Sequence, residues 1–63
     1  MGISNNQKIN HIEVYNAHGE MVNSYTVQNQ SLVSIDLSKF NSGIYTIIVF
    51  TKDSKYTSKY VKL

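Results

Sequence analysis

The sequence predicts an all-β fold, a small antiparallel Ig-like β-sandwich built from successive hairpins with about five strands. Ile, Val and Thr together number 17 and Tyr adds 5, whereas Ala occurs once, and this composition favours strands over helices. Apolar and polar residues alternate in short runs that polar turns separate, which is typical of half-buried strands. At 63 residues the chain forms one small domain, because a chain of this length buries only about 60% of the surface that its unfolded form exposes.

Five runs of residues are candidate strands: 9–16, 20–27, 32–37, 43–51 and 56–63. In the first run, Ile12 and Val14 are expected to face the core, since side chains alternate between the two faces of a strand. His11, Glu13 and Tyr15 then lie on the opposite face, which we expect to be mostly solvated.

The third and fourth runs supply most of the expected core. Alternation in the third run directs Val33, Ile35 and Leu37 inward. Leu37 and Phe40 are spaced to place one turn of 3₁₀ helix beneath the sheet. The fourth run is apolar on both faces, which is typical of a strand covered from both sides, so we expect residues 43–51 to form the centre of the core.

Two glycines are expected to have conformational roles. Gly19 lies in the turn 17–20, where it can adopt a positive φ without steric cost. Gly43 precedes a buried strand, which indicates a backbone conformation or a close approach that only glycine permits.

Composition argues against several classes of protein. The absence of Cys excludes disulfides, thiolate metal sites and a Cys nucleophile. All six basic residues are Lys and the net charge is +2, which disfavours nucleic-acid binding because Arg is the side chain that most often reads phosphate and guanine. No serine lies in a Gly-x-Ser-x-Gly segment, so we expect no enzyme, no cofactor and no small-molecule substrate.

Two groups of side chains have both a functional and a simpler interpretation. His11 and Glu13 share a strand face with His18 and Glu20 across the hairpin, and these four side chains could hold zinc. The simpler interpretation is a solvated strand face and turn, since nothing else completes a rigid coordination shell. The five tyrosines could bind a sugar or stack on bases, but strands also use tyrosines at core edges and in cross-strand pairs.

The final strand is basic, with Lys52, Lys55, Lys59 and Lys62 against the single acid Asp53. These lysines either dock the strand on an acidic receptor or prevent unwanted pairing at a sheet edge.

We do not expect residues 1–7 to form a secretory signal peptide, because they contain neither a basic n-region nor an apolar h-region. Residues 1–2, Met-Gly, are expected to be a remnant of cloning, which leaves residues 3–63 as a single domain. The polar start indicates a piece excised from a larger protein.

Several segments follow one another in a characteristic order. Ile12-Glu13-Val14-Tyr15-Asn16-Ala17-His18-Gly19-Glu20 comes first, followed by Ile35-Asp36-Leu37, Asn41-Ser42-Gly43-Ile44-Tyr45 and Lys59-Tyr60-Val61-Lys62. With these segments, residues 9–63 closely resemble the C-terminal sorting domain of type IX secretion cargo, also called the Por secretion tail.

The resemblance implies a non-catalytic C-terminal domain of a larger secreted protein in a Gram-negative bacterium. Such cargo passes through the periplasm, and the outer-membrane secretion machinery then recognises the folded tail and delivers the cargo to the cell surface or the medium. The family's glycines and aromatic residue match Gly19, Gly43 and Tyr45. By the same resemblance, recognition is expected in the terminal strand, at Lys59, Tyr60, Val61, Lys62 and Leu63.

The chain departs from the family pattern in three places. Glu20 stands where the family commonly has Gln, Lys or Arg, and Asp53-Ser54 stands where the last hairpin of the family often has Gly. The absence of Pro removes the usual Tyr-Pro-Asn-Pro-like opening. One or two N-terminal strands are therefore expected to be missing, and the exposed sheet edge would favour a homodimer. The alternative function is a structural or carbohydrate-binding β-module appended to a secreted hydrolase.

Overall fold

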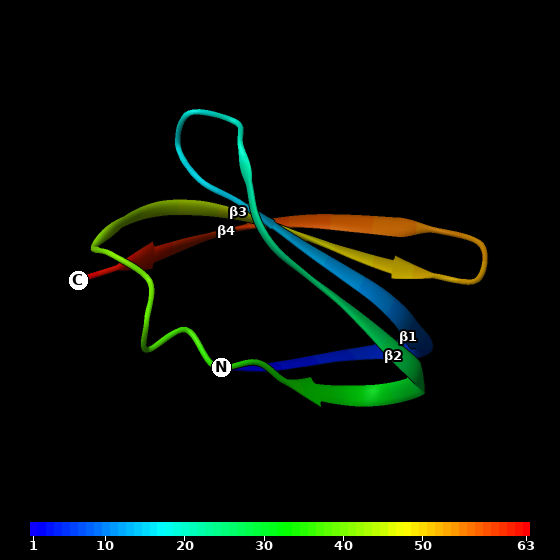
Figure 1. The fold of residues 1–63 in the computed structure, drawn as a ribbon. Helices are drawn as coiled ribbons and strands as arrows, with labels where there is room; N and C mark the ends of the chain where they lie inside the picture. Colours follow the sequence, from blue (N-terminus) through cyan, green and yellow to red (C-terminus); the bar gives the residue numbers. More distant parts are fainter.

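The computed structural model describes residues 1–63 as four antiparallel strands in a single sheet (Figure 1). The strands are β1 (Gly2–Tyr15), β2 (Met21–Ser34), β3 (Gly43–Thr51) and β4 (Lys55–Lys62). Their order across the sheet is β2-β1-β3-β4, so β2 and β4 are the edge strands. The predicted all-β antiparallel fold is confirmed.

The strands are fewer and longer than the sequence pattern predicted. Residues 21–27 and 32–34 belong to one strand, β2, and the first strand begins at Gly2 rather than at Ile9. The polar stretch between the two expected strands is a kink within β2, where Asn29 has a φ of 49°. A kinked strand keeps its hydrogen bonds on both sides of the irregularity, which sequence alternation alone does not reveal.

A bend in β1 folds the sheet into two layers. From Ser4 to Ile9, β1 advances five residues while its partners on β2 run only from Leu32 to Gln30. The extra residues on β1 form a local turn in which the Gln7 N–H donates to the Asn5 side chain. The start of β1 and the end of β2 consequently lie below the rest of the sheet (Figure 1), as in a small sandwich.

A buried threonine joins this bend to the far end of the sheet. The Thr51 hydroxyl lies 2.9 Å from Oε1 of Gln7, to which it donates, and it accepts a hydrogen bond of 3.1 Å from the Ser54 N–H. The bend in β1 and the β3–β4 turn are therefore held together by a satisfied buried polar group.

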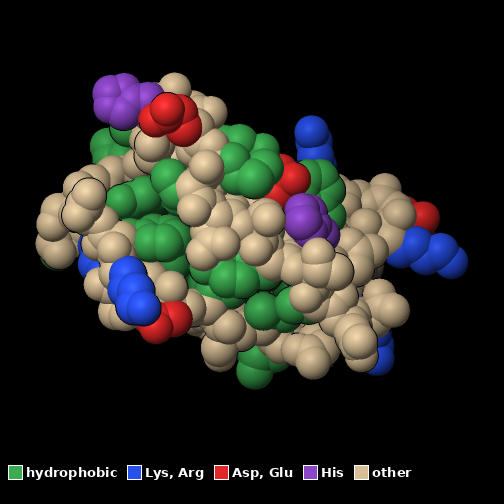
Figure 2. All heavy atoms as spheres, in the orientation of Figure 1, with side chains coloured by type: hydrophobic (Ala, Val, Ile, Leu, Met, Phe, Trp, Pro, Cys, Tyr) green, Lys and Arg blue, Asp and Glu red, His purple; other side chains and the backbone are tan.

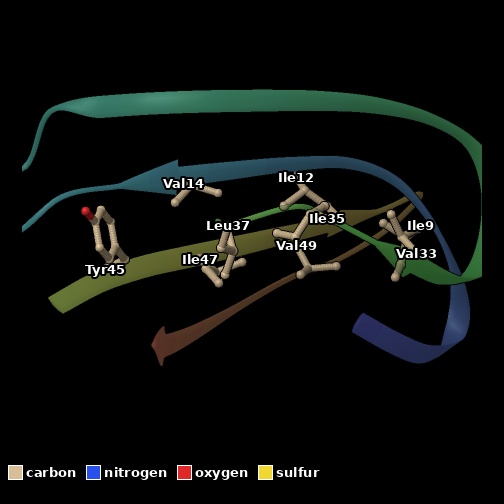
Figure 3. Packing of buried hydrophobic residues seen from close by; sticks show 9 residues of the cluster. All are labelled: Ile9, Ile12, Val14, Val33, Ile35, Leu37, Tyr45, Ile47 and Val49. Atoms are coloured by element: carbon tan, nitrogen blue, oxygen red, sulfur yellow. The ribbon is translucent and has the colours of Figure 1, made fainter. Parts of the chain in front are cut away.

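The core lies between the two layers and comprises nine buried apolar residues (Figure 3): Ile9, Ile12, Val14, Val33, Ile35, Leu37, Tyr45, Ile47 and Val49. In β1 and β3 the buried residues alternate, so the expected inward direction of Ile12 and Val14 is confirmed. Apolar side chains are visible across the middle of the face shown in Figure 2.

The connection formed by residues 35–42 closes the core, although it contains no regular strand or helix. Ile35 and Leu37 point inward as predicted, but they lie in this connection and not in a strand. The Phe40 N–H donates to the Leu37 carbonyl at 3.1 Å, which makes the single turn expected here. The Phe40 ring lies 5.1 Å from the ring of Tyr45.

The expectation that β3 is covered on both faces is wrong. The strand is covered only on the core side: Ile44 is 48% exposed, and Ile48 and Phe50 are half-buried. No second layer packs on this outer face; the Phe50 ring instead has the His11 ring as a neighbour, with 5.5 Å between centroids. Apolar residues on both faces of a strand therefore marked an open apolar surface in this chain.

Gly43 has a φ of 152°, and a Cβ added there would meet no atom within 4 Å. The backbone conformation, and not a close approach, therefore explains the glycine. We expect Gly43→Val to destabilise the fold by about 1–3 kcal/mol, because a β-branched residue is strained at this φ. Thermal unfolding measures the change.

Gly2→Ala is the matched control, since its new Cβ would make an ordinary contact of 3.9 Å with Leu32 and Gly2 has no positive φ. Equal unfolding temperatures for the Gly43→Val variant and the unmodified protein would contradict this account.

Candidate recognition surface

The terminal strand β4 lies at the edge of the sheet and pairs only with β3. Eight consecutive pairs join the two strands, from Gly43 with Lys62 to Phe50 with Lys55, without a register shift. β2, at the other edge, has several register shifts and the kink at Asn29. β4 is therefore the regular edge of the molecule.

The five residues expected to mediate recognition divide between the two faces of β4. Tyr60 pairs with the buried Tyr45 and packs against the core, and Lys62 lies on the same side. Lys59 and Val61 are exposed on the outer face, and Leu63 is fully exposed beyond the end of the strand. The structure thus brings Lys59 and Val61 together on one surface but turns Tyr60 and Lys62 away from it.

Lys62 is part of the fold. Its ammonium group donates a hydrogen bond to the carbonyl of Leu37, in the connection that covers the core. Nearby, the Ser38 N–H donates to the Asp36 carboxylate at 2.9 Å. This backbone hydrogen bond, with help from the Ser38 hydroxyl and the charge of Lys62, lowers the pKa of Asp36.

Asn16 organises the β1–β2 turn that contains Gly19. Its side-chain oxygen accepts the N–H groups of His18 at 2.9 Å and Glu20 at 3.0 Å, and its amide nitrogen donates to the Glu20 carboxylate at 3.1 Å. Gly19 has a φ of 84°, as the turn prediction required. Glu20, which departs from the family pattern, is used here as a hydrogen-bond acceptor that Gln would also supply.

The segment Asn41-Ser42-Gly43-Ile44-Tyr45 forms a second local unit. Gly43 turns the chain into β3, and the buried Tyr45 donates its hydroxyl to the Asn41 carbonyl at 2.6 Å. Both glycine motifs therefore hold turns, and their residues lie outside the exposed face of β4.

The structure does not bring the four candidate zinc ligands together. Nε2 of His11 lies 3.2 Å from the Glu13 carboxylate, which also accepts a 2.8 Å hydrogen bond from Tyr15. This bond to Glu13 is the main reason that the pKa of Tyr15 is raised. His18 and Glu20 lie in the turn, and the chain has no group of three or more His, Cys, Asp or Glu residues positioned to hold a metal ion.

The sequence analysis did not predict the structural roles of Asn16 and Lys62. The role of Asn16 was predictable, because Asn readily caps backbone N–H groups two and more residues onward. The role of Lys62 was not predictable, since it depends on a carbonyl 25 residues away.

The fold and this surface define a small all-β domain with one regular edge strand, β4, that carries lysines. The chain matches the family model described as a secretion system C-terminal sorting domain over residues 1–63. It therefore belongs to this family, whose members are non-catalytic C-terminal signals for type IX secretion.

Membership places the domain in a larger precursor that is delivered to the cell surface or outside the cell, and it implies contact with the secretion machinery. No curated protein and no solved structure matches the chain. The chain contains no helix long and apolar enough to cross a membrane.

The side chains of Lys62 and Lys59 point to opposite faces of β4, and the stability of variants at the two positions tests this difference. We expect Lys62→Met to lower the free energy of unfolding by about 1 kcal/mol, because the Leu37 carbonyl loses its charged donor. Lys59→Met, which removes the same charge from the exposed outer face, should stay within about 0.5 kcal/mol of the unmodified protein. Urea unfolding of the two variants compares them directly, and equal losses would contradict the assigned role of Lys62.

Proposed function

We propose that residues 59–63 form the part of this sorting domain that the secretion machinery recognises, and that the domain itself performs no catalysis. The observation that supports this is the position of β4, a regular edge strand that carries exposed lysines at Lys55 and Lys59. Charged side chains around an interface guide the encounter with a partner and select against wrong ones. The cargo would pass through the periplasm before the folded tail is recognised.

An export assay tests this function. A signal-peptide-bearing fluorescent reporter is fused to residues 1–63 and expressed in a cell with a working type IX system. We expect the intact fusion at the cell surface or in the medium, and we expect a twin that lacks residues 59–63 to be retained in the periplasm, since it lacks the recognised segment. Fractionation and surface labelling locate the reporter.

Deletion of residues 59–63 also removes the Lys62 contact with Leu37, so a fusion carrying Lys62→Met serves as the matched control. Export of the Lys62→Met fusion together with retention of the deletion would separate recognition from stability. Export of the deletion at the level of the intact tail would refute the proposed role of residues 59–63.

The free β4 edge also favours a second proposal, that the isolated domain forms a homodimer by strand pairing. The eight β3–β4 pairs continue without a bulge, and an unprotected regular edge can pair with another chain. We expect analytical ultracentrifugation at high protein concentration to give twice the mass of one chain. A mass of one chain under these conditions would exclude the dimer.

A further inference from the structure

One face of the β3–β4 hairpin remains without a role in the fold. It is defined by the outward-facing residues of the paired strands and is here called the outer hairpin face: Ile44, Thr46, Ile48, Phe50, Lys55, Thr57, Lys59 and Val61. These residues alternate with the core-facing residues Tyr45, Ile47 and Val49, so they lie on the opposite side of the sheet.

The most exposed apolar groups of this face lie at one end, whereas Ile48 and Phe50 farther along it are half-buried. Ile44 and Val61 are direct partners across the two strands, and they are 48% and 53% exposed. Partners of this kind have neighbouring side chains, so they form a continuous apolar spot. Neither residue belongs to the core cluster or packs against it.

The charge on the outer hairpin face has one sign. Lys55 and Lys59 are exposed, neither forms a salt bridge, and none of the eight residues of the face is acidic. On the neighbouring strand β1, the carboxylate of Glu13 lies on the same side of the sheet, and it is already bonded to His11 and Tyr15. Asp53, in the β3–β4 turn, forms no salt bridge with either lysine. The positive charge of the face is therefore free for a partner.

The cargo would not obstruct this face. In a C-terminal domain the cargo precedes residue 1, and Met1 pairs with Ile35 through two main-chain hydrogen bonds of 2.9 Å. The N-terminus lies in the lower layer, below β3 and β4 in Figure 1, and its partner Ile35 belongs to the core. The chain therefore starts on the core side of the sheet, opposite the outer hairpin face.

We propose that the outer hairpin face docks on an acidic protein surface of the secretion machinery, with Ile44 and Val61 in an apolar contact and Lys55 and Lys59 opposite carboxylates. This inference rests on the proposed function and deepens it, because it names Lys59 and Val61 as the residues of segment 59–63 that touch the partner and extends the contact to the neighbouring strand β3. Within the same segment, Tyr60 and Lys62 hold the hairpin against the core.

Charge argues for this partner over a second copy of the chain. A two-fold contact through the outer hairpin face would bring like lysines together, and the face has no carboxylate to pair with them. The exposed threonines and the small apolar spot also suit a protein surface, which combines apolar contacts with a polar rim.

The first test compares surface variants in the export assay. We expect Lys55→Glu/Lys59→Glu and Val61→Ser to lose surface delivery of the reporter, because each removes one half of the contact. The matched controls are Lys39→Glu, an exposed charge reversal in the connection, and Leu32→Ser, which removes a 62% exposed apolar side chain from β2. Both controls should be exported like the unmodified tail. Thermal unfolding of each purified variant confirms that it folds.

The outcomes separate the two proposals. If the unmodified tail is not exported, the proposed function fails. If it is exported and the outer-face variants are exported equally well, the function stands and the docking face is wrong. Equal loss of surface delivery in the outer-face variants and in their controls would also overturn the proposed docking face.

The second test detects the partner directly by crosslinking. A photo-crosslinking amino acid at position 57, in the middle of the outer hairpin face, is compared with one at position 26, on β2. We expect position 57 to crosslink to one component of the secretion machinery, and Lys59→Glu to abolish the adduct. Failure of position 57 to crosslink to any component of the secretion machinery would overturn the proposal, as would Lys-dependent binding of the purified domain to phosphatidylglycerol vesicles.

Discussion

The fold depends on the attachment of one irregular connection to the sheet. Residues 35–42 close the core but have no strand or helix to satisfy their backbone, and buried backbone groups must find partners. They do so at three points: Ile35 pairs with Met1, the Leu37 carbonyl accepts from Lys62, and the Asn41 carbonyl accepts from Tyr45. Two of these partners come from β3 and β4, so the core closes only when the hairpin is in place.

This dependence explains why residues of the family motifs are found at turns and anchors. Asn16 and Gly19 set the first turn, and Gly43 and Tyr45 set the entry to β3 and secure the connection. Each needs a side chain or a φ that few residues supply, which is a requirement of folding. Residues that contact a partner face a different requirement, namely exposure, and they lie on the other side of the hairpin.

The sequence predicted what depends on local patterns and missed what depends on distant contacts. Alternation correctly assigned Ile12 and Val14 to the core, and turn chemistry correctly assigned Gly19. The bend in β1 and the direction of Lys62 depend on pairing and on a carbonyl far along the chain. The apolar outer face of β3 was assigned to burial because composition does not distinguish a covered face from an open one.

That open face is the feature that folding alone does not explain. Scattered apolar residues are common on protein surfaces, but Ile44 and Val61 are adjacent partners beside Lys59, on a face where neither Lys55 nor Lys59 forms a salt bridge. Threonine at both positions would keep the β-branched shape that strands favour and would expose less apolar surface. An exposed apolar pair on a regular edge also carries a risk of aggregation. A small domain that retains it beside free positive charge has the composition expected of a surface that is covered when the domain meets its partner.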